Sequence, residues 1–535
     1  MKRMWLSVGL VGLVTLLAIA LAAPPLVCAS EGKFKITTEN GNTFRFGAQL
    51  RMIPTTENKW DFGMGTVPVF GGAASVNFKQ HTNEAGNVAQ DYIRTEARLY
   101  FTGEDKDKKW SLYSALEFDS AVDQNNVDRR GRDYGLERLH GIIKIPGLEQ
   151  VSFHAGWDIY YMDAVDAGAG FIYGDDDPGF WFTGDFDSIE FQVGYHKKFE
   201  NNFASRDEAE FLGDAANVSS DEDRDLYSAM LTYHVNDDNE VRFMGLYDIM
   251  KTRSSTNFPG VTNKGADVET YRVGVLYTGK LGIFEPEFEF VYQGGEANNI
   301  NLETGATPAA GDDFDIKAYA VYGDVALNLT DLVGFKVMPH VGFMYTSGDD
   351  DGDDDDLEGY SAVANAQRFT PRFGGEDTII GDGNILLGTI LYGYLPELYG
   401  SMGGTQNQGG VSTGGLANGS QGGRGDNPGM TMIGGGITIE PREYISYRTN
   451  FMWIEWNEDF QLNTFNGAGN QQVDSGTAGQ QWSNSLRVSL SRNVHIFGNA
   501  TLFWPGDAVK DVTEIYGNKS DDVAQRYAVA LIWRF

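Results

Sequence analysis

The sequence predicts an all-β fold: a transmembrane antiparallel β-barrel of about 18 strands, with short periplasmic turns and long extracellular loops. Three observations lead to this prediction. Long segments alternate apolar and polar side chains, the links between them alternate between short and long, and the chain ends on such a segment, RYAVALIWRF. Side chains of a strand alternate between its two faces, so each segment has one apolar and one polar face.

The length of the alternating segments separates this fold from a soluble β-sandwich, whose strands alternate in the same way. Sandwich strands commonly have about five or six residues, whereas a tilted strand needs about nine to eleven to cross hydrocarbon. The predicted strands are 43–53, 91–102, 109–119, 136–145, 151–158, 178–184, 188–198, 225–235, 240–250, 268–279, 283–293, 314–328, 335–346, 429–440, 443–456, 481–491, 494–504 and 523–535. Strand 178–184 is included because an even number brings both chain ends to the periplasmic side.

The links between these strands give an independent reason for a barrel. Short links such as PGLEQ, DFD and PR alternate with long ones such as 53–90, 251–267 and 347–428. Tight turns at one end and long loops at the other are typical of outer-membrane barrels. Because unpaired backbone groups are costly in lipid, the last strand is expected to close against the first.

The first 29 residues are predicted to be a secretory signal peptide, which leaves 30–535 as the barrel. Lys2 and Arg3 precede an apolar run, and Val27-Cys28-Ala29 resembles a cleavage site. Two alternatives are an uncleaved transmembrane helix and a lipoprotein signal acylated at Cys28. Cleavage after Ala29 removes the one cysteine, so the mature chain would have no disulfide and no thiol nucleophile.

The composition excludes some classes of partner. The formal net charge is −34, and loss of Lys2 and Arg3 leaves 39 bases against 75 acids, or −36. Such a chain does not attract nucleic acid or anionic lipid by charge. Aromatic residues make up 13% of the sequence and glycine contributes 67 residues against 15 prolines, which favours an ordered all-β protein over a disordered one.

An Asp-rich stretch, TSGDDDGDDDDLEGYS at 346–361, could hold calcium. With Gly352 at position six of a twelve-residue calcium loop, carboxylates fall at five ligand positions. These are Asp349, Asp351, Asp353, Asp355 and Glu358. The alternative is a solvated acidic loop without a metal. No other cofactor is expected, and calcium only in loop 347–358.

The same stretch and the one after it resemble the alginate-export family of outer-membrane porins. The resemblance lies in Ser347-Gly348-Asp349, the acidic run behind it, and Phe369-Thr370-Pro371-Arg372-Phe373. It covers roughly thirty residues and implies an eighteen-stranded barrel that passes polysaccharide or small solutes. The strongly negative net charge of this chain does not suit the polyanionic substrate of that family, because an exporter of a polyanion should line its pore with bases.

The polar faces of the strands supply the candidate pore lining. Arginines of the first, second and last strands should gather on one wall, with three glutamates of the eleventh strand opposite, giving a transverse field. The alternative is that these residues only pair across strands. The predicted pore-lining residues are Arg45, Arg51, Arg94, Glu96, Arg98, Glu117, Arg272, Glu285, Glu287, Glu289, Arg487, Arg526 and Arg534.

Loop 347–428 is a candidate constriction or gate. Loops this long are usually functional or disordered. The stretch ILLGTILYGYLPELYG within it is apolar enough to pack against another surface, and from Gly400 onward the loop is rich in glycine. The alternative is a mobile surface loop.

The predicted function is that of a porin in the bacterial outer membrane, allowing passive diffusion of small polar solutes or saccharides. Alternatives are a barrel sheath around a partner such as a multihaem cytochrome, and a polysaccharide export channel. No enzyme is expected, because the seven histidines show no metal-binding spacing and no nucleophile or phosphate-loop motif occurs. Expected partners are outer-membrane lipid, the solute and the barrel-insertion machinery, and a homo-oligomer is a further alternative. That machinery would read the terminal apolar face, formed by Tyr527, Val529, Leu531, Trp533 and Phe535.

Overall fold

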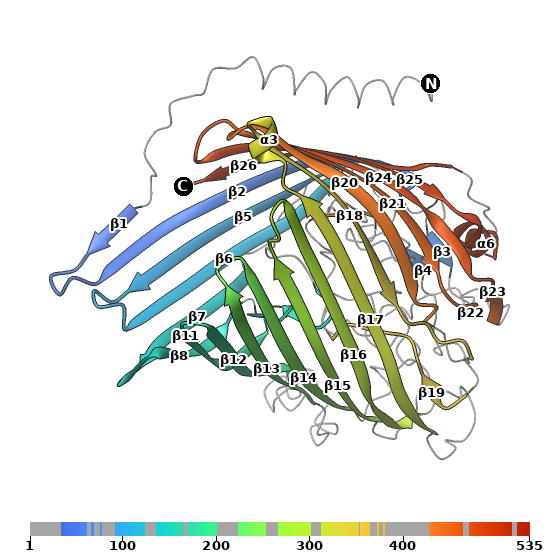
Figure 1. Cartoon of the computed structure of the whole chain (residues 1–535), viewed down its shortest axis with the longest axis horizontal. Helices are drawn as coiled ribbons and strands as arrows, with labels where there is room; N and C mark the ends of the chain where they lie inside the picture. The colour runs from blue at the N-terminus through green and yellow to red at the C-terminus, as the bar shows by residue number, and fades with distance from the viewer. Residues whose placement is uncertain are drawn as a thin grey trace, which may run out of the picture.

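The alternating segments form strands that pair around a ring in the computed structural model (Figure 1). The structure describes residues 34–60, 62, 66–68, 75–77, 91–123, 135–158, 160–163, 170–175, 177–200, 223–252, 266–300, 312–351, 354–363, 372–373, 378–379, 427–463, 470–515 and 522–535. The predicted signal peptide, residues 1–29, lies outside the described residues.

Eighteen described strands make the ring, and each is antiparallel to the next. In ring order they are β2 (Thr43–Asn58), β5 (Asp91–Glu104), β6 (Trp110–Asp123), β7 (Gly135–Ile145), β8 (Leu148–Trp157), β11 (Pro178–Phe186), β12 (Ile189–Glu200), β13 (Asp223–Asn236), β14 (Asn239–Thr252), β15 (Ala266–Gly279), β16 (Phe284–Ile300), β17 (Asp312–Leu327), β18 (Lys336–Thr346), β20 (Met430–Arg442), β21 (Ile445–Trp456), β24 (Gly476–Ser489), β25 (Val494–Pro505) and β26 (Ala524–Arg534). Each predicted strand corresponds to one of these, so the predicted fold is confirmed.

The remaining elements lie outside the ring order. β1 (Phe34–Thr37) pairs with β2, and β19 (Asp356–Leu357) runs parallel to β17. Three small hairpins and two helices complete the described elements: β3 (Thr66–Pro68) with β4 (Ser75–Asn77), β9 (Tyr160–Tyr161) with β10 (Gly174–Asp175), β22 (Phe460–Asn463) with β23 (Asn470–Val473), α3 (Thr330–Val333) and α6 (Asp507–Ile515). Of the helices in the described part of the chain, none has the length and apolar content to cross a membrane.

The ring closes where the last strand meets the first, as predicted. Gln49 lies opposite Arg534 in the β2–β26 pair, and the Phe535 backbone N–H donates to the Ala48 carbonyl over 2.8 Å. Beside this seam the Tyr100 hydroxyl donates to the Phe535 carbonyl over 3.0 Å. The Tyr100 ring lies so close to Gly47 that a Cβ there would be 2.1 Å from it, which explains a glycine in this strand.

The outer face of the ring is apolar. Large side chains such as Phe180, Phe243 and Val273 are about half exposed on the outside, while the residues between them point inward. The ring strands have from 9 to 17 residues, enough to cross a hydrocarbon layer when tilted. A closed barrel with such an outer face is a protein of the bacterial outer membrane.

Short turns gather at one end of the barrel and long links at the other (Figure 1). One short link contains α3, which is capped by the following residue, Gly334. Its φ is 84°, and the Gly334 N–H donates to the Thr330 carbonyl over 2.8 Å. The left-handed conformation is one that glycine adopts without strain. In barrels of this type the short turns face the periplasm.

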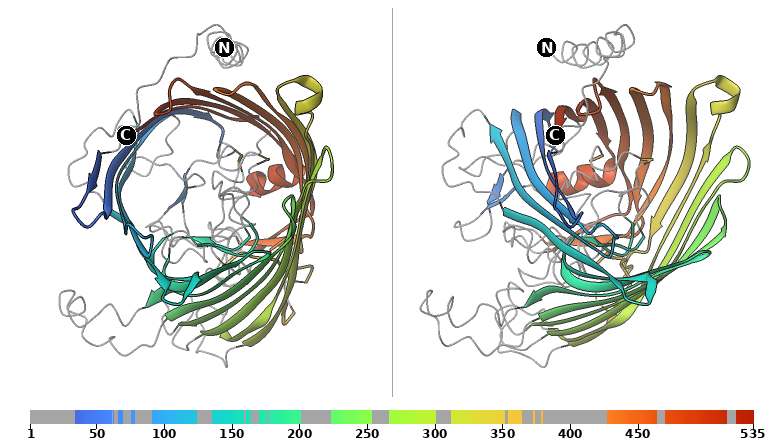
Figure 2. Two further views of the ribbon diagram at one scale, coloured as in Figure 1. Left: turned by 60° about the vertical axis from the view of Figure 1, so that its left-hand side comes forward. Right: turned by 90° about the vertical axis from the view of Figure 1, so that its left-hand side faces the viewer.

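Parts of the long links fold into the barrel instead of away from it. Helix α6 lies inside the ring of strands (Figure 2), and its Val509 and Val512 side chains are fully buried against neighbours from several links. Described residues of links 158–177 and 347–428 join the same apolar cluster. The interior is therefore partly filled, and no described residue of β5, β6, β7 or β8 belongs to this cluster.

Candidate functional site

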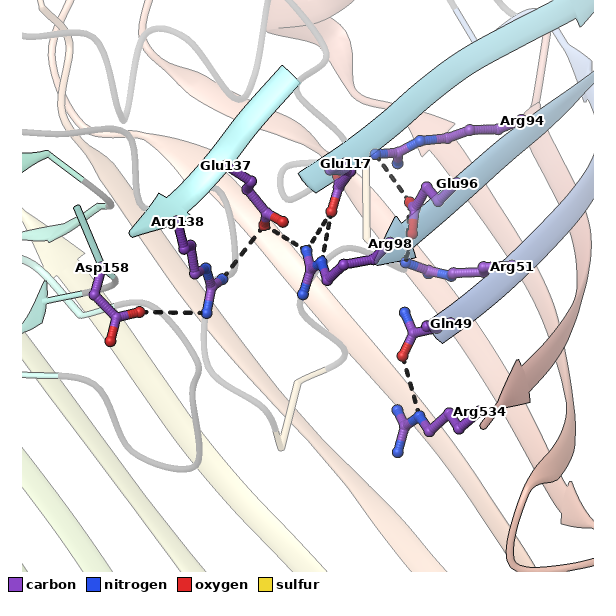
Figure 3. Close-up of polar contacts among 10 residues, drawn as sticks. All are labelled: Gln49, Arg51, Arg94, Glu96, Arg98, Glu117, Glu137, Arg138, Asp158 and Arg534. Atoms are coloured by element: carbon purple, nitrogen blue, oxygen red, sulfur yellow. Dashed lines mark hydrogen bonds and ion pairs between the residues drawn. The ribbon is translucent and has the colours of Figure 1, made fainter. Parts of the chain in front are cut away.

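Charged side chains alternate in sign along the inner face of β26, β2, β5, β6 and β7, which we call the charged wall (Figure 3). Arg51 and Arg94 both contact Glu96, each at an N–O distance of 3.1 Å. Nearer the short turns, Arg45 lies 3.4 Å from Glu104. The three arginine side chains keep between 29% and 37% of their surface exposed, so the lumen reaches them.

The alternation continues around the barrel onto β6 and β7. Arg98 lies between Glu117 and Glu137 and contacts both carboxylates. Arg138 in turn lies 3.6 Å from Glu137 and 3.7 Å from Asp158 (Figure 3). Each of these arginines thus has a carboxylate beside it, and the opposite charges largely cancel over a few ångströms.

The last strand completes the charged wall. The Arg534 side chain donates to the Gln49 amide oxygen over 3.1 Å, and the Arg526 Nε atom lies 3.6 Å from a Glu57 oxygen. The arginines of the first, second and last ring strands therefore share one wall, as the sequence suggested. The expected separation into a basic wall and an acidic wall is wrong, because carboxylates of the neighbouring strands stand between these arginines.

Three predicted pore-lining residues lie under folded links and do not reach the open lumen. Arg272 is fully buried, and its Nε and Nη2 atoms donate to the Ser361 carbonyl over 3.1 and 2.7 Å. Glu287 and Glu289 keep 8% and 4% of their surface exposed. The prediction for these three needs correction: they point inward, but links cover this side. We call the inner face of β12–β18, β20 and β21 the covered wall.

A second buried arginine of the covered wall escaped the sequence analysis. Arg224 donates two hydrogen bonds to the Asp248 carboxylate, over 2.9 and 2.7 Å, and one to the Val363 carbonyl over 3.1 Å. Both members of the pair are at most 1% exposed. A two-pronged contact satisfies the guanidinium fork, so the buried charge is compensated.

The described parts of loop 347–428 lie inside the barrel. Arg372 donates to the Glu285 carbonyl over 3.1 Å and to the Asp324 carboxylate, and Phe373 beside it is fully buried. Further along, the Ile379 N–H donates to the Gln481 side chain over 2.7 Å. The described residues thus contact the wall from β16 to β24, which a loop outside the barrel could not do.

Arg372 keeps its charge in this position. Burial works against the charged form, but the hydrogen bond to Asp324 and the nearby Glu287 carboxylate raise its pKa above the usual value. Asp324 also contacts His340, whose Nδ1 atom lies 2.7 Å from the carboxylate. His340 reaches the Asn450 side-chain oxygen on its other side over 2.8 Å. Arg372 is therefore held by a polar network that spans three strands.

A cavity of about 640 Å³ opens on the inner face near the short turns. Its lining combines charged, polar and apolar groups from seven strands, the link between β17 and β18, and the docked loop. The lining residues are Glu285, Ala326, Asn328, Lys336, Met338, His340, Arg372, Thr438, Glu440, Ser446, Arg448, Ser485, Arg487 and Phe497. A space of this size lies within the usual range of small-molecule sites.

The cavity is basic, although the protein as a whole is acidic. Four basic lining side chains, Lys336, Arg372, Arg448 and Arg487, face two acidic ones, Glu285 and Glu440. Two of the four are already compensated, because Lys336 pairs with Glu440 at 3.3 Å and Arg372 contacts the buried Asp324 carboxylate. The excess positive charge favours a solute that carries a negative group.

The sequence found only part of this cavity. Glu285 and Arg487 were predicted to line the lumen. Lys336 and Arg448 were missed, although both stand on inward positions of predicted strands, so the alternation itself could have identified them. Arg372 lies within the Phe-Thr-Pro-Arg-Phe stretch, but nothing in the sequence around it predicts that the loop brings it to this cavity.

The candidate calcium ligands lie at the end of β18 and in the chain that follows it. Asp349 is buried, and its carboxylate accepts the Asp351 N–H over 3.3 Å; the Asp355 carbonyl accepts the Asp315 N–H over 2.9 Å. Burial and neighbouring aspartates raise the pKa of Glu358. Asp353 lies outside the described residues. No three of the described His, Cys, Asp and Glu side chains are grouped to hold a metal ion.

Comparison with known proteins finds similarity only among solved structures, because no family model and no curated protein matches this chain. OccK5 (OpdH) of Pseudomonas aeruginosa is 12% identical with a TM-score of 0.42, and OpdK of the same organism, crystallised with vanillate, is 11% identical with a TM-score of 0.43. A BenF-like porin of Pseudomonas fluorescens Pf-5 is 9% identical with a TM-score of 0.44. Each alignment covers 92% of this chain and 98% of the other. The resemblance to the alginate-export family rests on the motifs between 347 and 373 alone.

Proposed function

We propose that this protein is a porin that lets small polar solutes or saccharides diffuse passively across the outer membrane. The observation that carries the proposal is the charged wall: a closed barrel, apolar outside, keeps partly exposed arginines and carboxylates on one inner side. Polar walls in a water-filled lumen let polar solutes pass and disfavour apolar ones. The route would run along the charged wall and leave through the basic cavity near the short turns.

The basic cavity refines the class of solute. Lys336, Arg448 and Arg487 come from three strands and surround a space that also contains Phe497. A carboxylate or phosphate on the solute would meet the arginines, and its carbon skeleton the Phe497 ring. Small organic acids and acidic sugars therefore fit the basic cavity better than neutral or cationic solutes of equal size.

Single-channel recording in planar lipid bilayers tests the proposal. We expect discrete conductance steps from the purified protein, a reversal potential shifted towards anions in a salt gradient, and stronger block by acidic than by neutral sugars. A protein that inserts but carries no current would refute the channel.

The covered wall weighs against the first alternative, a sheath around a partner chain. Described residues of the links already lie on the inner face from β12 to β24, where a partner would have to lie. A coloured haem protein that co-purifies with the barrel would nevertheless favour the sheath. Export of a polysaccharide would require a continuous passage for a chain, and the same recordings would show it as block by long oligomers from the periplasmic side.

The outer face of β26 is part of the same proposal, as the signal that the barrel-insertion machinery reads. Val529 and Phe535 are exposed on it, and the strand closes the ring. Deleting Phe535 should lower the amount of folded protein in the outer membrane several-fold while the translated amount stays the same. Normal membrane levels would refute this reading of the C-terminus.

A further inference from the structure

Two carboxyl groups lie buried against each other where link 158–177 meets the covered wall. Asp163 follows β9 of the hairpin β9–β10, and Glu289 stands on the inner face of β16. Asp163 keeps 2% of its surface exposed and Glu289 4%, and the two carboxyls lie close enough for a proton between them to make a hydrogen bond. Such a contact requires a proton, because two carboxylates only accept hydrogen bonds.

One oxygen of each carboxyl has no other donor. Asp163 Oδ2 accepts the Ile172 backbone N–H, but within the described residues neither Asp163 Oδ1 nor Glu289 Oε1 has a hydrogen-bond partner. A single proton between the groups satisfies both. Without it, two negative charges would be buried side by side with unsatisfied oxygens, which is costly.

The groups around the pair do not neutralise it. Glu287 adds negative charge from the same strand as Glu289. The neutral Tyr360 hydroxyl donates its hydrogen bond to the Phe171 carbonyl, and an ionised Tyr360 would repel the carboxylates. Arg272 is held by the Ser361 carbonyl, and Arg242 donates to the Met162 carbonyl over 3.1 Å. Burial raises the pKa of Asp163 despite the backbone N–H groups that favour its charged form.

The hairpin that carries Asp163 holds other parts of the interior. The Tyr160 and Ser228 hydroxyls lie 2.6 Å apart, which ties the hairpin to β13. The Val363 N–H donates to the Ile172 carbonyl over 3.1 Å, which ties loop 347–428 to the hairpin. Release of the hairpin from β16 would therefore also loosen the loop that covers the wall.

We propose that one proton shared by Asp163 and Glu289 locks hairpin β9–β10 onto the covered wall, and that its loss at rising pH frees the hairpin. The locked state binds one proton more than the released state above the ordinary carboxyl pKa of about 4. The lock is therefore strongest at acid pH. Above that value the ratio of released to locked hairpins rises up to about tenfold per pH unit, until the locked pair itself loses its proton. The consequence for conduction rests on the proposed channel function; the lock itself does not.

Thiol labelling of a buried reporter tests the lock without any current. In a Cys28→Ser background, Met162→Cys places a thiol at a fully buried position of the hairpin, next to Asp163, and Thr438→Cys places one in the cavity. The ratio of their labelling rates cancels the rise of thiolate with pH. We expect this ratio to rise with pH between about pH 5 and 9, towards tenfold per unit.

Matched variants identify the groups responsible. In Asp163→Asn/Glu289→Gln the amides keep the shape and a hydrogen bond but hold no titratable proton, so the ratio should become flat. Glu287→Gln, a neighbouring acid outside the pair, should keep the slope. A flat ratio in the parent protein, or an unchanged slope in the double variant, would overturn the proposal. If the double variant does not fold, Glu289→Gln alone decides, since it also removes the shared proton.

The same proteins in planar bilayers separate the two proposals. A slope in labelling together with conductance that grows with pH supports both. A slope without any current refutes the channel and leaves the lock intact, whereas current without a slope refutes the lock and leaves the channel intact.

Discussion

The charged wall and the covered wall follow the same sequence pattern but have different surroundings. Arg94 on β5 and Arg272 on β15 both occupy inward positions of long alternating strands. The Arg94 side chain is 35% exposed, whereas Arg272 is fully buried. In a barrel this wide, an inward polar residue meets water only where no link lies over it. Strand pattern therefore decides which residues face inward, and the links decide which of them face the lumen.

The hydrogen-bond partners of the arginines also differ between the two walls, according to whether a link covers the wall. On the charged wall, Arg51 and Arg98 pair with carboxylates of neighbouring strands, so these contacts form with the barrel itself. On the covered wall, Arg224 and Arg272 also donate to the carbonyls of Val363 and Ser361 in loop 347–428. These contacts form only when the loop has entered the barrel.

Breaking an ion pair on each wall should give the largest difference between them. Asp248→Ala leaves the Arg224 charge buried without its carboxylate, which should cost about 3–5 kcal/mol. Glu104→Ala removes the partner of Arg45 where both side chains are about one-third exposed, which should cost about 0–1 kcal/mol. Urea unfolding in lipid vesicles, followed by tryptophan fluorescence, measures both. Equal losses would contradict the distinction between the walls.

The second largest difference between the walls is expected in the accessibility of engineered cysteines to a water-soluble thiol reagent. Gln49→Cys lies on the charged wall, and Ala320→Cys lies at a fully buried position of the covered wall. With Cys28 replaced, a charged methanethiosulfonate reagent should reduce the current through the Gln49→Cys channel and leave that of Ala320→Cys unchanged. Rapid block of the Ala320→Cys channel would mean that the links do not shield this wall in solution.

A smaller effect is expected at the basic cavity, where the two walls meet near the short turns. Arg487→Glu removes one of four basic lining groups and adds an acid, so the reversal potential should move by several millivolts towards cations. Arg492→Glu makes the same change of charge on an exposed turn outside the cavity lining. An equal shift in both variants would assign selectivity to the overall charge of this end.

Calcium at the Asp-rich stretch should have the smallest effect, because the stretch lies at the edge of the covered wall. Calcium should raise the midpoint of thermal unfolding by a few degrees, and deletion of 349–356 should remove that increase. Magnesium at equal concentration controls for screening of the acidic residues. Unchanged melting with and without calcium in both proteins would exclude the site.

The sequence was sufficient for the ring but not for its filling. Most ring strands show their two faces within about ten residues, so a local pattern predicts them, including the closing pair of β2 and β26. Strand β11 was inferred from the even number of strands instead. The covering of Arg272 by Ser361 depends on where an 82-residue link, 347–428, folds back, and no local pattern carries that information. For the same reason the Arg224–Asp248 pair was missed: Asp248 occupies an inward position of predicted strand 240–250, but Arg224 precedes predicted strand 225–235 by one residue.

The seam between β2 and β26 also fixes an order of events during biogenesis. The hydrogen bond from Arg534 to Gln49 joins residues 485 positions apart, so the part of β2 from Gln49 onward, beyond its short pairing with β1, has no partner on that edge until the ribosome has made the final strand. A growing sheet with an open edge must be shielded by another protein, or it will pair with the wrong chain. Because the inward links need a finished enclosure around them, they should settle last, as the slowest step of maturation.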